Sequence, residues 1–458
     1  MSAIAAEIFK AYDIRGIVDK SLTEAGVELI GRALGTEGLK RGGKTIVVGR
    51  DGRLSGPALS AALARGLQAA GMNVIDIGVV ATPMVYFGAY HYGVGSGVMV
   101  TGSHNPPDYN GLKMVLQGET LALDAITNLR AAIEKDAFSK GAGTYEQRDI
   151  SDAYVERIVG DIKISRPMKI VMDCGNGSPA AIGPRLFKAL GCELVELFCT
   201  VDGTFPNHHP DPSQPKNLQD VIRALKETDA ELGIAFDGDG DRLGVVTKDG
   251  EIIYPDRQLM LFAADVLSRV PGGEIIFDVK CTRHLFKWIR DHGGRPTLWK
   301  TGHSLVKLKM KETGAPLAGE MSGHIFFKER WYGFDDALYC GARLLEIVSR
   351  EKDANAPLKA LPNAISTPEL NWKLDEGEPH RIIEALTGTA TFTGANEILT
   401  IDGLRVEYPD GFGLARASNT TPVIVIRFEA DTEAALTRIK EDFRRVLQPS
   451  KPQAPLPY

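Results

Sequence analysis

The sequence predicts an α/β protein in which three related α/β units with mixed sheets are followed by a smaller C-terminal α+β domain. The first observation is a pattern of strand, loop, helix, glycine and strand that occurs three times along the chain. The second is the length, because 458 residues suffice for about three units of roughly 150 residues each. The third is a change of pattern near the C-terminus, where one β-rich run leads into a single amphipathic helix.

Each of the three repeats has the order of a parallel βαβ unit. The expected strand, helix and strand cover 44–51, 54–70 and 73–77 in the first unit, 169–177, 181–190 and 193–198 in the second, and 274–280, 284–292 and 296–299 in the third. A glycine follows each helix, where it permits the left-handed conformation that ends many helices. Because βαβ units are common, the recurrence favours a duplication without requiring one.

The C-terminal part has a different pattern. A strand at 422–428 precedes a helix at 431–447, for which Asp431 is the expected N-cap and five apolar residues recur at helical spacing. The proline-rich residues 448–458 are expected to run extended over the surface. We predict domains at 1–149, 150–251, 252–363 and 364–458.

Composition excludes several classes of function. The net charge of −6, from 53 basic and 59 acidic residues, argues against binding to nucleic acid or to an anionic membrane. The five cysteines form no C-x-x-C pair, which argues against a disulfide framework and a zinc site and favours a reducing compartment. The sequence has no signal-peptide pattern and no run long enough to cross a bilayer. We therefore expect a cytoplasmic protein of enzyme size.

The most informative segment is Thr101–Gly111, in which Ser103 lies between a glycine and a histidine. Two prolines and an Asn-Gly pair predict a rigid, exposed turn that neither continues as a strand nor begins a helix before about Gly111. Ser103 follows the β-rich run 97–100, and open α/β sheets place reactive groups at the ends of strands. Such a hydroxyl suits a serine that carries or accepts a phosphoryl group. Acyl transfer is the alternative, but no distinct base-and-orienter pair accompanies the serine.

Three alternating aspartates, Asp237, Asp239 and Asp241, follow the buried run 232–236 and precede Arg242. The intervening glycines allow the carboxylates to converge on one hard cation. An EF-hand calcium loop does not fit, because its sixth position is Arg242 and its twelfth is Lys248. The alternative is a solvated acidic turn that binds no ligand. We predict a Mg²⁺ site that oxygens of a phosphorylated serine complete, with Arg242 helping to bind phosphate.

A third loop, Gly319–His324, offers groups that suit sugar hydroxyls. Glu320 is an acceptor, Ser322 is a donor and acceptor, and His324 can donate a hydrogen bond or exchange a proton. Taken alone, this loop could equally be a capped turn with a satisfied histidine.

A fourth loop, Arg416–Pro422, suits a phosphate. Its arginine can bind a phosphate bidentately, and its short hydroxyl and amide side chains add donors without bulk. The alternative is a polar connection between strands. Together the four loops contain the groups that phosphoryl transfer needs: a phosphoryl carrier, a cation, a sugar clamp and a remote phosphate anchor.

The residue sequences of these loops, and their order along the chain, resemble those of the α-D-phosphohexomutase superfamily, most closely its bacterial phosphomannomutase/phosphoglucomutase branch. The resemblance covers essentially the whole chain, from Lys10–Gly16 to the terminal Leu456-Pro457-Tyr458. It implies four domains around a central cleft. It also implies a phosphoserine isomerase that interconverts hexose 1- and 6-phosphates of mannose and glucose through a bound 1,6-bisphosphate. Mg²⁺ is the implied cofactor, glucose 1,6-bisphosphate the implied activator, and we expect a monomer.

The resemblance also assigns roles to residues. Ser103 would be the phosphoserine and a metal ligand together with Asp237, Asp239 and Asp241. The implied catalytic residues are Ser103, Lys113, His324, Arg15 and His104. The implied substrate-binding residues are Tyr12, Arg242, Lys280, His303, Glu320, Met321, Ser322, Arg416, Ser418, Asn419 and Thr420. Either Lys113 or His324 would be the general acid/base, and the sequence leaves that choice open.

Three other functions could use the same groups. Phosphoglucosamine mutases usually carry glutamine where this chain has Met321, which favours mannose and glucose phosphates over glucosamine phosphate. A Mg²⁺-dependent sugar phosphatase would use the same groups with water as the acceptor, and closure of the domains over the sugar would suppress that reaction. A phosphosugar-binding protein without activity is disfavoured by the intact serine and aspartates.

Overall fold

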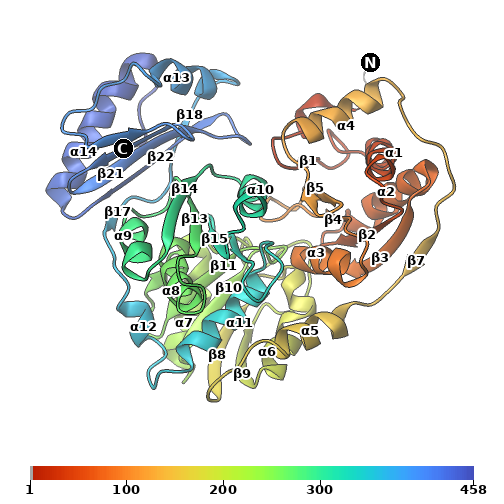
Figure 1. The fold of residues 1–458 in the computed structure, drawn as a ribbon, viewed down its shortest axis with the longest axis horizontal. Coiled ribbons are helices and arrows are strands. Elements are labelled where there is room, and N and C mark those ends of the chain that lie inside the picture. The colour runs from red at the N-terminus through yellow and green to blue at the C-terminus, as the bar shows by residue number, and fades with distance from the viewer. Residues whose placement is uncertain (1–3) are drawn as a thin grey trace.

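The computed structural model describes residues 4–458, which form four β-sheets with their helices. In Figure 1 the four units follow one another along an arc, with the first unit (red to orange) and the last (blue) at its two ends. The second and third units (yellow to cyan) lie between them and contact each other closely. No helix in the described range is both long and apolar enough to cross a membrane.

The first unit contains a seven-stranded mixed sheet in the order β1-β5-β4-β2-β3-β7, with β6 paired to β5. Strands β4, β2, β3 and β7 are parallel, whereas β5 and β1 run antiparallel to their neighbours. The elements are a short 3₁₀ turn η1 (Ala6–Ile8), β1 (Ile14–Ile17), α1 (Glu24–Lys40), β2 (Thr45–Arg50), α2 (Gly56–Ala70), β3 (Asn73–Val79), α3 (Thr82–His91), β4 (Gly97–Val100), β5 (Tyr109–Leu116), β6 (Glu119–Thr120), α4 (Asp124–Glu134) and β7 (Tyr145–Gln147).

The second unit has a five-stranded sheet in the order β12-β11-β10-β8-β9, of which β10, β8 and β9 are parallel. Its elements are α5 (Ser151–Val159), β8 (Met168–Asp173), η2 (Ser178–Ala181), α6 (Gly183–Ala189), β9 (Cys192–Leu197), η3 (Pro215–Leu218), α7 (Gln219–Glu227), β10 (Leu232–Phe236), β11 (Leu243–Thr247) and β12 (Ile252–Ile253).

The third unit has a four-stranded sheet in the order β14-β13-β15-β16, in which only β16 is antiparallel. Its elements are α8 (Pro255–Leu267), β13 (Glu274–Asp278), α9 (His284–Asp291), β14 (Arg295–Trp299), α10 (His303–Thr313), β15 (Leu317–Gly319), β16 (Ile325–Phe327), α11 (Ala337–Val348) and α12 (Ala356–Lys359).

The last unit differs from the others because its strands pair only in antiparallel fashion. Its six-stranded sheet has the order β17-β22-β21-β20-β19, with β18 also paired to β22. Its elements are β17 (Ile365–Ser366), β18 (Leu370–Lys373), α13 (Glu378–Leu386), β19 (Glu397–Leu399), β20 (Leu404–Tyr408), β21 (Gly411–Ala417), β22 (Val423–Ala430), α14 (Glu433–Leu447) and η4 (Gln448–Ser450). The predicted class, three mixed α/β units followed by an α+β unit, is confirmed.

Several expected boundaries need correction. The helix expected from residue 54 begins at Gly56, and the one expected at 181–190 is α6, which begins two residues later and follows the 3₁₀ turn η2. Strand β5 begins at Tyr109, two residues before the expected end of the turn. The N-cap of α14 is Thr432, whose hydroxyl accepts a hydrogen bond from the Ala435 amide, and not Asp431. The domain boundaries stay predictions.

The C-terminal tail was expected to lie extended on the surface, and this expectation is wrong. Residues Gln448–Ser450 form a 3₁₀ turn, and Leu456 is buried. The ring of Tyr458 packs edge-on against Phe428 of β22, with ring centroids 4.8 Å apart. Apolar side chains in the tail therefore complete the core of the last unit, because their burial removes apolar surface from water.

One continuous apolar cluster joins the first three units, the first unit has a second large cluster to itself, and the last unit has its own core. Val47 of the first unit, Ile234 of the second and Phe277 of the third belong to the same buried cluster. The last unit contacts the third partly through buried Arg405, whose guanidinium donates to the carbonyl oxygens of Val279 at 2.7 Å and Cys281 at 2.6 Å. The last unit is thus attached partly through polar groups.

Asp336, the buried N-cap of α11, gives a prediction for the pH dependence of stability. Its carboxylate accepts from Tyr154 Oη and from the Tyr339 amide, but burial raises its pKa to about 7. The folded state therefore holds this proton more tightly than the unfolded state, so the stabilising contribution is complete below about pH 4 and is lost as the pH rises to about 7. We expect Asp336→Asn to make stability fall less over this range, by at most about 4 kcal/mol.

The measurement is urea unfolding of both proteins at a series of pH values. Asp152→Asn is the matched control, because Asp152 is exposed on α5 and pairs with Arg185 at the surface. If the pH dependence of Asp336→Asn equals that of the parent protein, the carboxylate of Asp336 does not make this contribution.

Candidate active site

Ser103 lies just after β4 and is 1% exposed, so the predicted exposed turn is corrected: the serine itself is buried, whereas Pro106 and Pro107 are exposed. Its φ of 51° is in the left-handed region, which a serine adopts only at a cost of about 1–3 kcal/mol. Its amide donates to Thr101 Oγ1 at 2.8 Å. The loop thus holds one hydroxyl in a fixed, shielded position.

Arg53 holds this loop in place, and sequence reasoning missed it. Its guanidinium is fully buried and donates to the carbonyl oxygens of Ser103 at 2.9 Å and Asn105 at 2.6 Å, and also to those of Pro106 and Tyr109. Asp51 Oδ2 accepts from Arg53 Nε and from Thr101 Oγ1. The available signal was the run Gly49-Arg-Asp-Gly-Arg53 at the end of β2, which places the charged pair of Asp51 and Arg53 just after a buried strand.

The loop between β10 and β11 brings the three predicted aspartates beside the serine. Asp237, Asp239 and Asp241 are 0% exposed, and Ser103 Oγ donates to Asp237 Oδ2 at 3.3 Å. Gly238 permits this approach, because a Cβ there would lie 2.5 Å from the carbonyl oxygen of Ser103. Burial, with the like charges of the other two aspartates, raises the pKa of Asp237 well above its usual value.

Lys113, on β5, is buried among the same carboxylates. Its Nζ donates to Asp239 Oδ2 at 2.7 Å and to Asp241 Oδ2. Burial alone would lower the pKa of Lys113, but the two carboxylates outweigh it and hold that pKa well above its usual value. The side chain therefore carries a positive charge into the centre of the site.

These aspartates fit a divalent cation. Asp237, Asp239 and Asp241 each offer a ligand atom, and these atoms lie within 4.8 Å of one another. Asp239 Oδ1 and Asp241 Oδ1 are buried, and neither has a hydrogen-bond partner among residues 4–458. Unpartnered carboxylate oxygens in a buried cluster are the donors that hard divalent cations prefer.

A cavity of about 760 Å³ borders this site, and loops of all four units line it. The predicted site residues on its wall are Tyr12, Arg15, His104, Arg242, Lys280, His303, Glu320, Met321, Ser322, His324, Arg416, Ser418, Asn419 and Thr420. The other five predicted residues, Ser103, Lys113, Asp237, Asp239 and Asp241, are buried next to it. The structure thus brings together every residue that the sequence singled out.

His104 and Arg15 lie at the serine end of the cavity. His104 Nδ1 is 3.2 Å from Ser103 Oγ. Burial, followed by the positive charges of Arg242, Arg15 and Lys113, lowers the pKa of His104 well below its usual value. His104 is therefore a neutral hydrogen-bond partner of the serine hydroxyl, and Arg15 is paired with Asp13.

The loop between β15 and β16 presents Glu320, Ser322 and His324. Glu320 Oε1 accepts from the Gly302 amide, and burial raises the pKa of Glu320 to about 7. Its Oε2 has no hydrogen-bond partner in the described chain. Gly302 has a φ of 136°, and a Cβ there would lie 2.8 Å from the ring of Tyr12. The loop therefore keeps one carboxylate oxygen available beside the cavity.

His324 is held by neighbours on both ring nitrogens. Nδ1 lies 2.8 Å from Ser322 Oγ, and Nε2 accepts from Arg242 Nε at 3.4 Å. Nε2 also lies 3.3 Å from Asp241 Oδ1, so the ring joins the sugar loop to the aspartate loop. The ring of His303 stacks on that of His324, with centroids 5.4 Å apart. Burial, followed by Lys307 and His324, lowers the pKa of His303 well below its usual value.

The last unit supplies the positive end of the cavity. Arg416 is 4% exposed; its Nε donates to Asp402 Oδ2 at 2.9 Å, while one terminal nitrogen has no hydrogen-bond partner within residues 4–458. Asn419 donates to Tyr12 Oη, which joins the last unit to the first. Sequence reasoning missed Asp402 and Glu369, the latter 2.7 Å from Lys280 Nζ. Asp402 is 14 positions from Arg416 and Glu369 is 89 positions from Lys280, and both lie outside the recognised motifs.

Comparison with known proteins identifies this arrangement. Residues 6–140, 152–250 and 254–365 match alpha/beta/alpha domains I, II and III of phosphoglucomutase/phosphomannomutase, and residues 369–446 match its C-terminal domain. The chain belongs to the phosphoglucomutase/phosphomannomutase family. The resemblance seen in the loop motifs is thereby confirmed.

Individual members of the phosphoglucomutase/phosphomannomutase family match over nearly their full length. The chain is 61% identical over 451 residues to the phosphoglucomutase of Neisseria meningitidis serogroup A, covering 98% of each chain. It is 57% identical over 456 residues to the phosphomannomutase/phosphoglucomutase of Pseudomonas aeruginosa, covering 99% of this chain and 98% of the relative. A crystal structure of a phosphoglucomutase/phosphomannomutase family protein from Burkholderia thailandensis superposes with a TM-score of 0.95 at 62% identity, covering 99% of this chain and 100% of the other.

Proposed function

We propose that this chain interconverts the 1- and 6-phosphates of mannose and glucose by phosphoryl transfer through Ser103. The observation that carries the proposal is that the buried serine and the three aspartates border the same cavity as Arg416 of the last unit. A phosphoryl carrier and a separate phosphate anchor at one cavity suit a substrate with two phosphorylation positions. Closely similar family members are named phosphomannomutase/phosphoglucomutase, which supports this activity.

The reaction starts with a phosphoryl group on Ser103. The bond between phosphorus and Ser103 Oγ breaks, a bond to the free sugar hydroxyl forms, and the hydroxyl proton passes to Nε2 of His324, a residue that lines the cavity. The resulting 1,6-bisphosphate turns over within the cavity, its other phosphoryl group returns to Ser103 Oγ, and the sugar oxygen that loses it takes the proton back from His324. Because the serine hydroxyl donates to Asp237 Oδ2, His104 Nδ1 is the donor to the serine oxygen.

Other residues hold the substrate and exclude water. Glu320 and Ser322 hold the 3- and 4-hydroxyls of the sugar. Met321 lies between these two residues in the loop, and the ring of His303 packs against His324 of the same loop. Arg416, Ser418, Asn419 and Thr420 hold the phosphate that is not transferred, together with Tyr12 and Lys280. Arg15, Lys113 and Arg242 offset the charge of the transferring group. Mg²⁺, bound by Asp237, Asp239 and Asp241 with an oxygen on Ser103, would supply further charge stabilisation. Glucose 1,6-bisphosphate acts as activator because it transfers a phosphoryl group to Ser103 when that serine is unphosphorylated.

We further propose that the enzyme acts as a cytoplasmic monomer without nucleic acid or membrane partners, since one chain supplies residues to the cavity from all four units. A coupled assay tests the activity itself. Purified protein receives Mg²⁺, a trace of glucose 1,6-bisphosphate, and mannose 1-phosphate or glucose 1-phosphate. We expect the matching 6-phosphate as the product. Release of inorganic phosphate alone would identify the protein as a sugar phosphatase. Activity only with glucosamine phosphate would identify it as a phosphoglucosamine mutase.

Arg416→Ala is expected to raise the KM for the sugar phosphate by roughly tenfold to a hundredfold with a smaller effect on kcat, since the guanidinium binds the phosphate that stays in place. Steady-state kinetics in the same assay measures both constants. Arg438→Ala is the control, because Arg438 lies exposed in the same unit and pairs with Asp410 at the surface. An unchanged KM in Arg416→Ala would exclude the anchoring role.

A further inference from the structure

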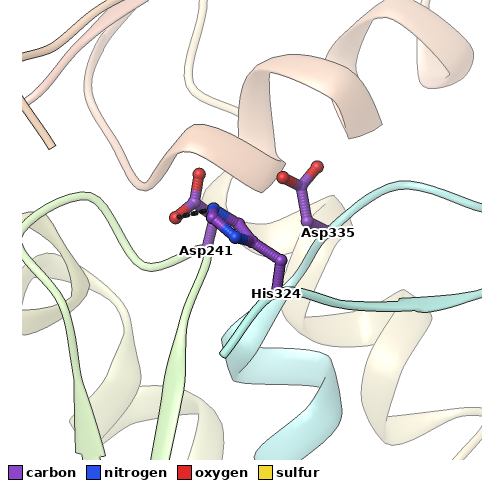
Figure 2. Close-up of side chains that lie close together, drawn as sticks. All are labelled: Asp241, His324 and Asp335. Atoms are coloured by element: carbon purple, nitrogen blue, oxygen red, sulfur yellow. Dashed lines mark ion pairs between the residues drawn. The ribbon is translucent and has the colours of Figure 1, made fainter. Parts of the chain in front are cut away.

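A second cluster of metal-binding side chains lies beside the three-aspartate site. It consists of Asp241, His324 and Asp335, all buried, and one ligand atom of each lies within 4.8 Å of the others. Figure 2 shows the three side chains together, with Asp241 on the loop after β10 and the other two on the segment drawn in cyan. Only Asp241 is shared with the cluster of Asp237 and Asp239.

Each carboxylate in this cluster has one occupied and one unoccupied oxygen. Lys113 donates to Asp241 Oδ2, and Lys307 donates to Asp335 Oδ1 at 2.8 Å. Asp241 Oδ1 and Asp335 Oδ2 are buried without a hydrogen-bond partner in the part of the chain that the structure describes, and each faces a histidine nitrogen: His324 Nε2 lies 3.3 Å from the first and His303 Nδ1 lies 3.7 Å from the second. Both aspartates are 0% exposed, so water does not satisfy these oxygens at the surface. Two buried, unpartnered carboxylate oxygens are costly unless a cation or proton meets them.

The histidine completes the donor set. Its Nε2 lies 3.3 Å from Asp241 Oδ1, where the dashed line in Figure 2 marks the pair. A divalent cation bound between these two atoms would replace the proton that they share. Ligands about 2.0–2.1 Å from a tetrahedral Zn²⁺ are separated by about 3.3–3.4 Å, which matches this distance. On its other side, His324 Nδ1 is paired with Ser322 Oγ, as ligating histidines usually are with a neighbouring acceptor.

We propose that Asp241, His324 and Asp335 form a binding site for Zn²⁺, adjacent to the site formed by Asp237, Asp239 and Asp241 and sharing Asp241 with it. The imidazole favours Zn²⁺ over Mg²⁺, which prefers oxygen ligands, and three protein ligands leave a fourth coordination position. The scarcity of cysteine motifs, which argued against a zinc site, does not bear on a site built from histidine and carboxylates.

Zinc in this site has a consequence for the reaction, and this step alone rests on the proposed function. Zn²⁺ would occupy the lone pair on His324 Nε2 to which the sugar hydroxyl proton passes. Zn²⁺ is therefore expected to inhibit turnover reversibly while Mg²⁺ is saturating, and a chelator selective for zinc is expected to restore activity.

The test is binding of Co²⁺, a spectroscopic substitute for Zn²⁺, to the purified full-length protein in saturating Mg²⁺. We expect the intense visible absorption of four-coordinate Co²⁺, which Zn²⁺ displaces at one ion per chain. Asp335→Asn, which keeps the shape of the side chain, is expected to weaken Zn²⁺ binding by more than about a hundredfold in equilibrium dialysis. Asp237→Asn is the matched control, because Asp237 belongs only to the three-aspartate cluster.

The control separates the two sites without any activity measurement. Absorption that survives in Asp335→Asn but is lost in Asp237→Asn would place the ion among the three aspartates and overturn the proposal. The weak absorption of six-coordinate Co²⁺, or no binding beyond the Mg²⁺ site, would overturn it as well. Zinc binding without mutase inhibition would leave the site standing and count only against the role of His324 in proton transfer.

Discussion

Ser103→Ala is expected to lower mutase turnover by roughly a thousandfold or more, because it removes the atom to which the phosphoryl group is bonded. The expected loss is in kcat, since Arg416 and the sugar-binding loop remain. Intact-mass spectrometry is expected to show a phosphorylated fraction in the parent protein and none in the variant. The fold is expected to persist, because Oγ makes only contacts of 3.2 Å with His104 and 3.3 Å with Asp237.

Ser178→Ala is the matched control for this variant. Ser178 is also buried, and its hydroxyl donates to the carbonyl oxygen of Gly238 in the aspartate loop at 3.3 Å, but it does not line the cavity. Its loss is expected to change turnover by less than about tenfold, as for the removal of one neutral hydrogen bond. Near-normal turnover in Ser103→Ala, in a protein whose mass confirms the substitution, would refute phosphoryl transfer through this serine.

Arg53→Met is expected to destabilise the serine loop by about 3–5 kcal/mol, as for breaking a buried charged network. The methionine fills much of the space, but it leaves the carbonyl oxygens of Ser103 and Asn105 without their donor and Asp51 without its positive partner. Because the serine then loses its fixed position, turnover is expected to fall by roughly a hundredfold, since small displacements of a reacting group have effects of this size.

Amide hydrogen exchange measures the destabilisation of the serine loop directly. Amides of Thr101–Gly111 are expected to exchange faster in Arg53→Met, while those of β2 and β4 keep their protection. Arg65→Met is the control, because Arg65 is half-exposed on α2 and pairs with Glu28 at the surface. Unchanged exchange of the loop together with normal turnover would show that Arg53 does not hold the serine in place.

Much of the fold and the site could be predicted from the sequence because the reactive residues occur in short, local motifs. Alternating apolar residues and glycines located the three βαβ units, since burial of one face and the turns between elements are local properties. Helix ends were less certain: Asp431 and Thr432 are both good caps, and only the position of the Ala435 amide decides between them. The tail was misjudged because Tyr458 packs on Phe428, thirty positions earlier.

The sequence by itself determined the reactive groups of this protein: the serine, the three aspartates, the sugar-binding loop and the arginine anchor, with their order along the chain. The tertiary structure decided what those groups meet. Ser103 and Asp237 are 134 positions apart, and Lys113 and Asp241 are 128 apart, yet each pair is in contact. Burial of the serine, its support by Arg53 and the meeting of His324 with Asp335 depend on how separate sheets pack. No local pattern encodes such contacts, because their energy comes from groups that only the folded chain brings together.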